Sequence, residues 1–206
     1  MSTGKLYIIS APSGAGKTSL VRQLTSEVDN LVVSISHTTR RIRPGEKDGE
    51  DYFFVSPTEF QALLDGNDLL EHASVFDNFY GTAKKTVETN LADGLDVILE
   101  IDWQGAQQIK KICPDCTSIF ILPPSTEVLE LRLKNRGQDD DLIIARRMRE
   151  AVTEMSHHSE FDYILVNDVF EYALSELKSI IIANRLTKDR QQQNLKNLLA
   201  ALLSST

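Results

Sequence analysis

The residues best suited to chemistry form a glycine-rich stretch near the start of the chain, at 13–18 (SGAGKT). It follows an apolar run at 6–9 and precedes a helical pattern that begins at Lys17. Glycines let backbone N–H groups turn toward anionic oxygens, and the helix N-terminus adds about half a positive charge. The lysine can reach the β- and γ-phosphates of a nucleotide, and the Thr18 hydroxyl can bind Mg²⁺. The stretch therefore predicts a phosphate-binding loop (P-loop).

One position departs from the usual pattern of such loops, G-x-x-x-x-G-K-[ST], because Ala11 stands where the first glycine is expected. The remaining positions match, and so does the context of a strand before the loop and a helix after it. A tight turn that happens to contain glycines is the alternative, but a Lys-Thr pair at a helix start serves no purpose in a turn. The predicted triphosphate-binding residues of the loop are Ala11, Pro12, Ser13, Gly14, Ala15, Gly16, Lys17 and Thr18.

Arginines gather in three places in a chain whose net charge is -8. Arg40 and Arg43 stand three residues apart, just before a Pro-Gly turn, and two forked guanidiniums at that spacing can clamp one phosphate monoester. The other two groups lie at 132–136 and 146–149, where solvated helix faces are the alternative. An acidic protein that concentrates its arginines indicates small phosphate ligands, because proteins that bind nucleic acid non-specifically are usually basic overall.

Two carboxylates are positioned to contact a ligand. Asp102 follows an apolar strand at 97–101, so it lies at the carboxyl edge of a sheet, where α/β proteins bind ligands. Glu71 sits near the start of another strand pattern, and a plain surface carboxylate is its alternative. Tyr52 and Tyr80 stand in aromatic segments, where packing in the core is the alternative to a role in binding.

These residues must be held by segments that alternate between strand and helix. Continuously apolar strands separated by helices are typical of a parallel sheet covered on both faces. A helix start is predicted at Ser56, which precedes a proline and forms a capping box with Glu59. The predicted strands are 6–10, 31–36, 52–55, 69–76, 97–101, 118–122 and 163–166. Besides the helix that starts at Ser56, the predicted helices are 17–28, 82–93, 103–112, 125–136, 139–158 and 169 onward.

The region 37–90 differs from the rest, because its strands are short and aromatic and its turns are dense. We therefore predict a small α+β lobe at 37–90, inserted into a core formed by 1–36 and 91–206. The last stretch, 191–206, has a helical leucine pattern that could dock, pair with another subunit or fray.

Cys113 and Cys116 form a C-x-x-C pair, for which a redox site or half a zinc site is the alternative to two free thiols. No apolar run approaches the ~18 residues of a membrane span. The first residues lack the basic start and apolar middle of a signal peptide, so we expect a cytoplasmic protein.

Five motifs carry a family resemblance that covers almost the whole chain. They are SHTTR at 36–40, RPGE at 43–46, GEDYFFV at 49–55, NFYGT at 78–82 and IDWQG at 101–105. Together with the P-loop they resemble guanylate kinases of the bacterial type. The resemblance implies the three-layer α/β fold of P-loop NTPases. It also implies Mg²⁺-dependent phosphoryl transfer from ATP to GMP, giving ADP and GDP.

The resemblance also implies roles for particular residues. Those expected to hold the GMP phosphate are Arg40, Arg43, Tyr52 and Tyr80, and those expected to recognise guanine are Ser36, Glu71, Thr82 and Asp102. For Glu71 the chemistry agrees, because a carboxylate accepts hydrogen bonds from both N1–H and N2–H₂ of guanine, a donor pair that adenine lacks.

On the ATP side, a helical lid at about 136–149 is expected to close and bring arginines to the triphosphate. The residues implied there are Arg132, Arg136 and Arg147, with Asn167 against adenine. The implied catalytic group is Lys17, Arg40, Arg136 and Arg147. Thr18 would bind Mg²⁺ with the ATP phosphates, and Glu100 would contact it through water, at a position where the family often has Asp.

Two other functions fit parts of the pattern. One is a protein-interaction module that has lost activity, although such domains commonly lack the P-loop lysine that is present here. The other is a kinase for a different nucleoside monophosphate or for a sugar phosphate, which the guanine-edge residues oppose. The expected partners are ATP and GMP, with no nucleic acid and no membrane, and a homo-oligomer is possible.

Overall fold

The computed structural model describes residues 3–75, 77–135 and 141–204. Its central element is a five-stranded, wholly parallel sheet with the order β2-β7-β1-β8-β9. The strands are β1 (Leu6–Ser10), β2 (Leu31–Val33), β7 (Asp96–Glu100), β8 (Thr117–Leu122) and β9 (Tyr163–Val166). The sheet confirms the parallel core predicted from the continuously apolar strands.

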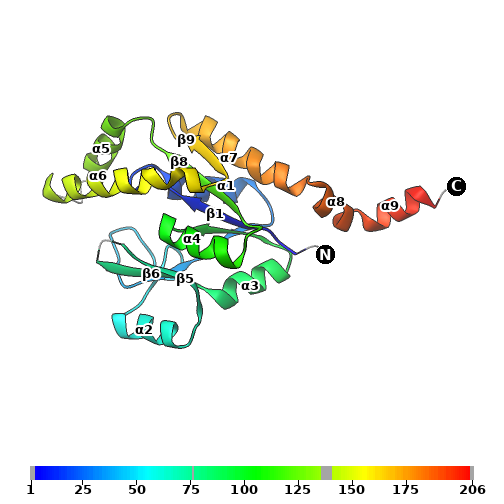
Figure 1. The fold of residues 1–206 in the computed structure, drawn as a ribbon, viewed down its shortest axis with the longest axis horizontal. Coiled ribbons are helices and arrows are strands. Elements are labelled where there is room, and N and C mark those ends of the chain that lie inside the picture. Colours follow the sequence, from blue (N-terminus) through cyan, green and yellow to red (C-terminus); the bar gives the residue numbers. More distant parts are fainter. Residues whose placement is uncertain (1–2, 76, 136–140, 205–206) are drawn as a thin grey trace.

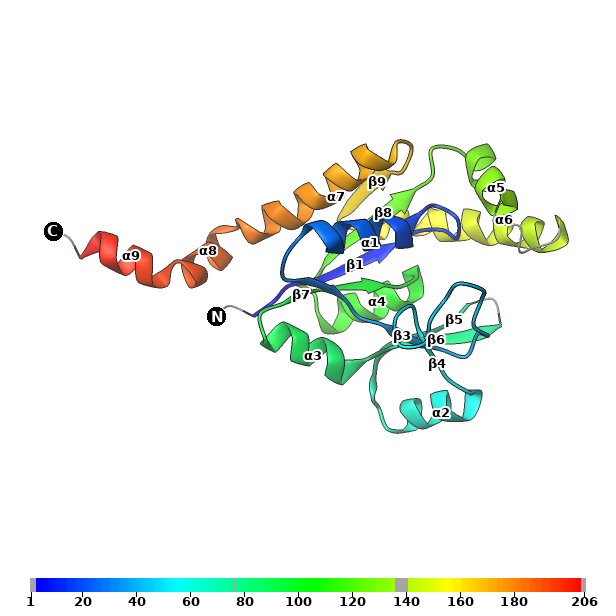
Figure 2. The same ribbon diagram turned by 180° about the vertical axis from the view of Figure 1, so that it is seen from behind.

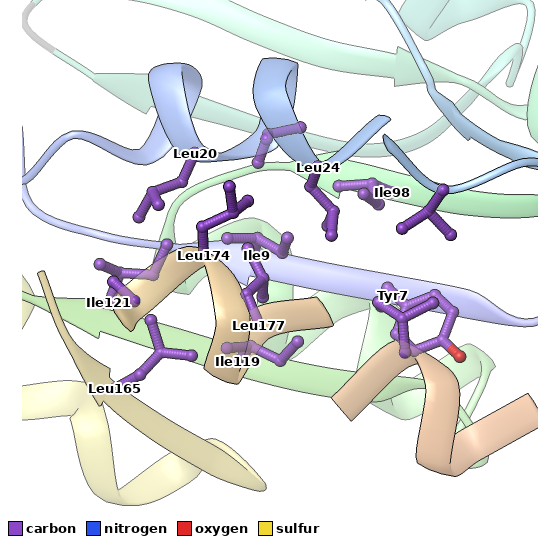
Figure 3. Close-up of a cluster of buried hydrophobic side chains, with 14 of the residues drawn as sticks. Tyr7, Ile9, Leu20, Leu24, Ile98, Ile119, Ile121, Leu165, Leu174 and Leu177 are labelled. Atoms are coloured by element: carbon purple, nitrogen blue, oxygen red, sulfur yellow. The ribbon is translucent and has the colours of Figure 1, made fainter. Parts of the chain in front are cut away.

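Helices cover both faces of this sheet (Figures 1 and 2). One face packs against α1 (Lys17–Glu27) and α7 (Phe170–Arg185), and the other against α3 (Lys84–Ala92) and α4 (Trp103–Ile112). Neighbouring residues of a strand point to opposite faces, so Ile9 lies in the α1/α7 core and Ile8 in the other. Figure 3 shows the first core, in which Leu20, Leu174 and Leu177 meet the sheet. The predicted three-layer α/β fold is therefore confirmed.

A second sheet lies beside the first, with the order β4-β3-β6-β5. Its strands are β3 (Ser36–Thr38), β4 (Phe53–Phe54), β5 (Leu69–Val75) and β6 (Asn78–Ala83), and it carries α2 (Pro57–Asp65). The capping box predicted at Ser56 and Glu59 is present at the start of α2. This small α+β unit overlaps the lobe predicted at 37–90, although the division of the chain at those two boundaries stays a prediction.

Two predicted elements are wrong around the second sheet. The strand predicted at 31–36 is interrupted, because β2 ends at Val33 and β3 begins at Ser36 in the other sheet. The helix predicted at 82–93 begins only at Lys84, because residues 78–83 form β6, which pairs with β3 and β5. Pairing between distant strands overrode the local pattern in this segment.

Two helices project from the sheet on the side away from both termini, α5 (Thr126–Asn135) and α6 (Asp141–Ser156) (Figure 2). They enclose a small apolar cluster of their own, which includes Leu133 and Ile144. At the end of α6, His157 stacks on Trp103, with ring centroids 3.6 Å apart. The predicted lid at 136–149 falls partly on 136–140, which lie outside the described residues.

The C-terminal segment is not the single long helix predicted from 169 onward. After α7 come α8 (Lys188–Asn194) and α9 (Lys196–Leu203), and α9 extends away from the body (Figure 1). The buried Asp96 carboxylate anchors the start of this segment, because it accepts hydrogen bonds from Arg185 and Arg190 at 2.8 Å each. Leu202 and Leu203 on α9 are exposed.

Cys113 and Cys116 are free thiols, and burial raises the pKa of Cys116 to about 11. A thiol with that pKa is almost fully protonated at neutral pH, which argues against redox chemistry at this pair. Within the described residues, no helix has the length and apolar character that crossing a membrane requires.

Candidate active site

The P-loop joins β1 to α1, as predicted. Gly14 and Gly16 both have a φ of 94°, in the left-handed region that favours glycine, and Gly16 caps α1. A Cβ at Gly16 would lie 2.3 Å from Nδ2 of Asn167. Glycine is therefore required at this position both by the backbone conformation and by the close approach of Asn167.

A cleft of about 650 Å³ opens between the P-loop, the second sheet and α6. Most of the predicted site residues line it, although they come from elements far apart in the sequence. Those brought together in the cleft are Ala11, Pro12, Ser13, Gly14, Gly16, Lys17, Thr18, Ser36, Arg40, Arg43, Tyr52, Glu71, Tyr80, Glu100, Asp102 and Arg147.

Five predicted residues are not among those that line the cleft. Ala15 and Thr82 are fully buried behind it, and Arg136 lies outside the described residues. Asn167 is buried and donates through Nδ2 to the Ala15 carbonyl at 2.7 Å. Arg132 donates to the Asn167 carbonyl at 2.9 Å. Arg132 and Asn167 therefore support the P-loop from behind in this structure.

Thr18 and Glu100, the residues expected at Mg²⁺, are neighbours. The Thr18 hydroxyl donates to Oε2 of Glu100 at 3.0 Å. A hydroxyl and a carboxylate are the hard oxygen ligands that Mg²⁺ prefers, and Mg²⁺ usually completes its octahedron with phosphates and water. The residues present therefore fit a magnesium ion that arrives with a nucleotide.

Three guanidiniums converge on the opposite side of the cleft. Burial and the positive charges of Arg40 and Arg147 lower the pKa of Arg43. Glu46 is the counter-ion, since it takes a forked pair of hydrogen bonds from Arg40 at 2.8 and 3.0 Å and another from the Arg43 backbone N–H at 2.8 Å. Arg40 and Arg43 thus share one carboxylate, and two guanidiniums so close together suit a phosphate group.

Two tyrosines complete this anion site. Arg40 lies over the Tyr52 ring, 5.3 Å from its centroid, and the Tyr52 and Tyr80 rings meet edge to face. Burial raises the pKa of Tyr52 to about 12, so its hydroxyl keeps its proton and can donate a hydrogen bond to an anion.

Glu71 lies deep in the cleft and is only 3% exposed. Its Oε1 accepts a hydrogen bond from the Thr82 hydroxyl at 2.7 Å, and Thr82 is also within hydrogen-bonding distance of Ser36. Burial raises the pKa of Glu71 to about 7. Asp102 caps α4 through Gly105, where a Cβ would lie 2.5 Å from Oε2 of Glu71. A glycine at 105 is what allows Glu71 to approach this helix end.

Four acidic residues of the cleft had no individual role predicted from the sequence, namely Glu46, Glu50, Asp51 and Glu154. Glu46 lies in the RPGE motif, so its spacing from Arg43 was a usable signal. Glu154 stands in a helix pattern with no motif around it. The only signal for it is the helical spacing from Arg147 to Glu154, which puts both side chains on one face.

Fold and site together define a class: a P-loop kinase with a triphosphate site and a separate anion site for a phosphorylated acceptor. A family model described as guanylate kinase matches residues 3–184. The chain is 58% identical over 205 residues to guanylate kinase of Hahella chejuensis, covering 100% of this chain and 99% of that one. It is 56% identical to guanylate kinase of Saccharophagus degradans, covering 98% of each chain. This chain therefore belongs to the guanylate kinase family.

A solved structure agrees with this assignment. The crystal structure of guanylate kinase from Anaplasma phagocytophilum is 36% identical to this chain and covers 94% of each chain, with a TM-score of 0.79. The similarity covers nearly the whole chain, and the family resemblance carried by the five motifs is confirmed.

Proposed function

We propose that this chain transfers the terminal phosphoryl group of ATP to GMP within the cleft, giving ADP and GDP. The observation that carries the proposal is that the P-loop and the Arg40/Arg43 anion site face one another across a single cavity. Phosphoryl transfer depends on positioning and charge neutralisation more than on covalent chemistry by the protein. Two phosphate sites that share one cleft supply the positioning.

On the donor side, the P-loop N–H groups and Lys17 hold the β- and γ-phosphates. Thr18 and Glu100 would hold Mg²⁺, the hydroxyl directly and the carboxylate through water, and the ion would neutralise charge on the phosphates. Arg147, which lines the cleft from α6, adds positive charge toward the transferred group. Arg132 and Arg136 complete the donor site in this proposal, and Asn167 contacts adenine.

On the acceptor side, Arg40 and Arg43 clamp the GMP phosphate, and Tyr52 and Tyr80 donate hydroxyl hydrogen bonds to it. Guanine lies against Glu71, which accepts from N1–H and N2–H₂. Ser36, Thr82 and Asp102 complete the base site. A site built to satisfy these donors rejects adenine, because Glu71 would be left buried without a partner.

We also propose a cytoplasmic location, where both nucleotides are available and free thiols persist. Nucleic acid and membranes are not partners in this proposal, in line with the acidic net charge of -8. Assembly into a homo-oligomer stays a prediction.

Lys17→Ala tests the proposed donor site. Transfer should fall by at least a hundredfold, because the lysine charge acts on the transferred phosphoryl group. Lys17 lies at the start of α1, outside the apolar cores, so circular dichroism and the melting temperature should match those of the unmodified protein. Activity within tenfold of the unmodified protein, with an intact fold, would contradict the assignment.

A further inference from the structure

Glu154 brings a carboxylate to the part of the cleft where the triphosphate is proposed to bind. It lies on α6 and lines the cleft together with Ser13 and Lys17 of the P-loop. Its Oε2 is buried and has no hydrogen-bond partner among the residues that the structure describes. A buried carboxylate oxygen without a partner is unfavourable, so a structural role alone does not account for it.

The same face of α6 carries Arg147 and Glu154, with the buried Ala151 between them. These residues are separated by four and three positions, which is the spacing of one helix face. Arg147 and Glu154 therefore present opposite charges to the cleft, about 10 Å apart along the helix axis. A helix that only delivered positive charge to a triphosphate would have no use for this carboxylate.

The groups that face Glu154 come from three other elements. Lys17 at the start of α1 attracts its negative charge, and the backbone N–H of Ser13 in the P-loop also favours the ionised form. Asp102 at the start of α4 and Glu150 on α6 itself repel it. Burial is the largest effect and raises the pKa of Glu154 to about 7. The carboxyl group is therefore close to half ionised at neutral pH, and its favourable partners both belong to the P-loop.

We propose that Glu154 is a positioning residue that serves as the internal counter-ion of the nucleotide-free P-loop and competes with the triphosphate of ATP for Lys17 and Ser13. The proposal rests on the proposed donor role of the P-loop. A triphosphate brings several negative charges to the place where the carboxylate lies. The carboxyl group must therefore take up a proton when the triphosphate binds beside it. In this way Glu154 opposes ATP binding and makes it depend on pH.

The proposed competition predicts how the affinity for ATP depends on pH. If binding requires a neutral carboxyl at Glu154, ATP affinity falls as the pH rises above 7, because a growing fraction of the carboxyl must be protonated first. For a pKa of about 7, the loss is about tenfold at pH 8 and negligible at pH 6. The phosphates of ATP also titrate near this range. The unmodified chain must therefore be compared with a variant that lacks only the Glu154 carboxyl group, so that the contribution of the ATP phosphates is the same for both.

Glu154→Gln is that variant, since it keeps the shape and removes the charge. Titration calorimetry with Mg·ATP should be run at pH 6, 7 and 8, in two buffers of different ionisation enthalpy so that bound protons are counted. We expect Glu154→Gln to bind Mg·ATP up to about tenfold more tightly than the unmodified chain at pH 8 and equally at pH 6. The proton uptake of the unmodified chain at pH 7 should be lost.

Glu176→Gln is the matched control. It removes the same charge from an exposed position on α7, and Glu176 is not among the residues that line the cleft. Its ATP affinity and proton uptake should equal those of the unmodified chain. If Glu154→Gln does not fold, Glu154→Ala serves in the same titration with the same expectation.

The outcomes separate the two proposals. Unchanged or weaker ATP binding by the Glu154 variants, with proton uptake retained, would overturn the inference while leaving the proposed function intact. If the unmodified chain itself failed to bind Mg·ATP, the proposed donor site would be wrong, and the inference would fall with it.

Discussion

Arg43 lies beside two further guanidiniums, an arrangement that is stable only with negative charge nearby. Glu46 supplies part of that charge, and in our account the GMP phosphate supplies the rest. Arg43→Ala should therefore raise the KM for GMP. Losing one charge-assisted clamp costs about 1.5–3 kcal/mol, or roughly ten- to hundredfold in affinity. The KM for ATP should change less than threefold.

Steady-state kinetics with each substrate varied in turn checks this. Arg41→Ala is the matched control, because Arg41 is an exposed neighbour that does not line the cleft. Equal effects of Arg43→Ala on both substrates would remove Arg43 from the acceptor site.

Glu71 is proposed to bind guanine, and its burial should lower the stability of the protein without nucleotide. Its pKa in the folded chain is about 7, whereas the ordinary value is 4.5. Between these values the folded chain still holds a proton that the unfolded chain has released, so folding stability falls as the pH rises through this window. Glu71→Gln removes the titrating group, and its oxygen can still accept from Thr82.

We therefore expect Glu71→Gln to match the unmodified protein in stability at pH 4.5 and to exceed it by about 2–3 kcal/mol at pH 8. Denaturant unfolding without nucleotide at both pH values measures the difference. A stability gain that is the same at both pH values would show that the carboxyl group does not titrate as described.

At the scale of single residues, the P-loop and the Arg40/Arg43 pair could be predicted from the sequence because each lies in a short local motif, and the structure places both on one cleft. The supporting roles of Arg132 and Asn167 could not be predicted, since they arise from contacts across 117 and 152 positions of the chain. The position of Glu154 in the cleft could not be predicted either, because it depends on how α6 is oriented in the folded chain.

Among the elements, those with strong local signals were predicted well. The predicted helix 103–112 and the predicted strand 163–166 agree with α4 and β9, because each has clear ends and one consistent pattern. Strand β6 was missed, since its residues form a strand only through pairing with β3 and β5. The break after β2 was missed for a related reason: the chain changes sheets there without a proline or glycine to mark the change.

Helix α2 offers a test of element stability apart from the cleft. Ser56 accepts a hydrogen bond from the Glu59 N–H at 3.2 Å, and the Glu59 carboxylate accepts one from the Ser56 N–H at 2.7 Å. Ser56→Ala should lower the free energy of unfolding by about 1 kcal/mol through loss of the cap. The value of kcat should stay unchanged, because α2 does not line the cleft.

Denaturant unfolding measures the change in stability of Ser56→Ala, and a kinase assay on the same sample measures its kcat. Ser26→Ala serves as the control, since its hydroxyl bonds only to a carbonyl within α1, and its stability should change by less than 0.5 kcal/mol. A large loss of activity in Ser56→Ala would mean that α2 acts on the site.

At the scale of the whole molecule, the proposed phosphoryl transfer requires the second sheet and α6 to approach one another around the nucleotides. Water must be excluded during transfer, or ATP is hydrolysed instead. The structure already links the two parts by an ion pair between Asp77 and Arg146 at 3.1 Å. Both partners are substantially exposed, so this pair is weak and does not prevent opening.

Distance labels at Gln61 on α2 and Arg149 on α6 report this movement, in a background without Cys113 and Cys116. We expect the distance distribution to shorten and narrow when GMP and a non-hydrolysable ATP analogue are both bound, and to change only partly with either alone. A distribution that both ligands leave unchanged would contradict closure.

The most direct test of the account is a coupled assay that compares kcat/KM for GMP, AMP, UMP, CMP and dTMP with ATP as donor, in the unmodified chain and in Glu71→Gln. We expect a strong preference for GMP. In Glu71→Gln, GMP should lose about 2–4 kcal/mol of transition-state stabilisation, because an amide accepts with one oxygen only and turns a donor toward guanine, while AMP changes little. Comparable rates with several acceptors, or an equal fall for GMP and AMP, would contradict it.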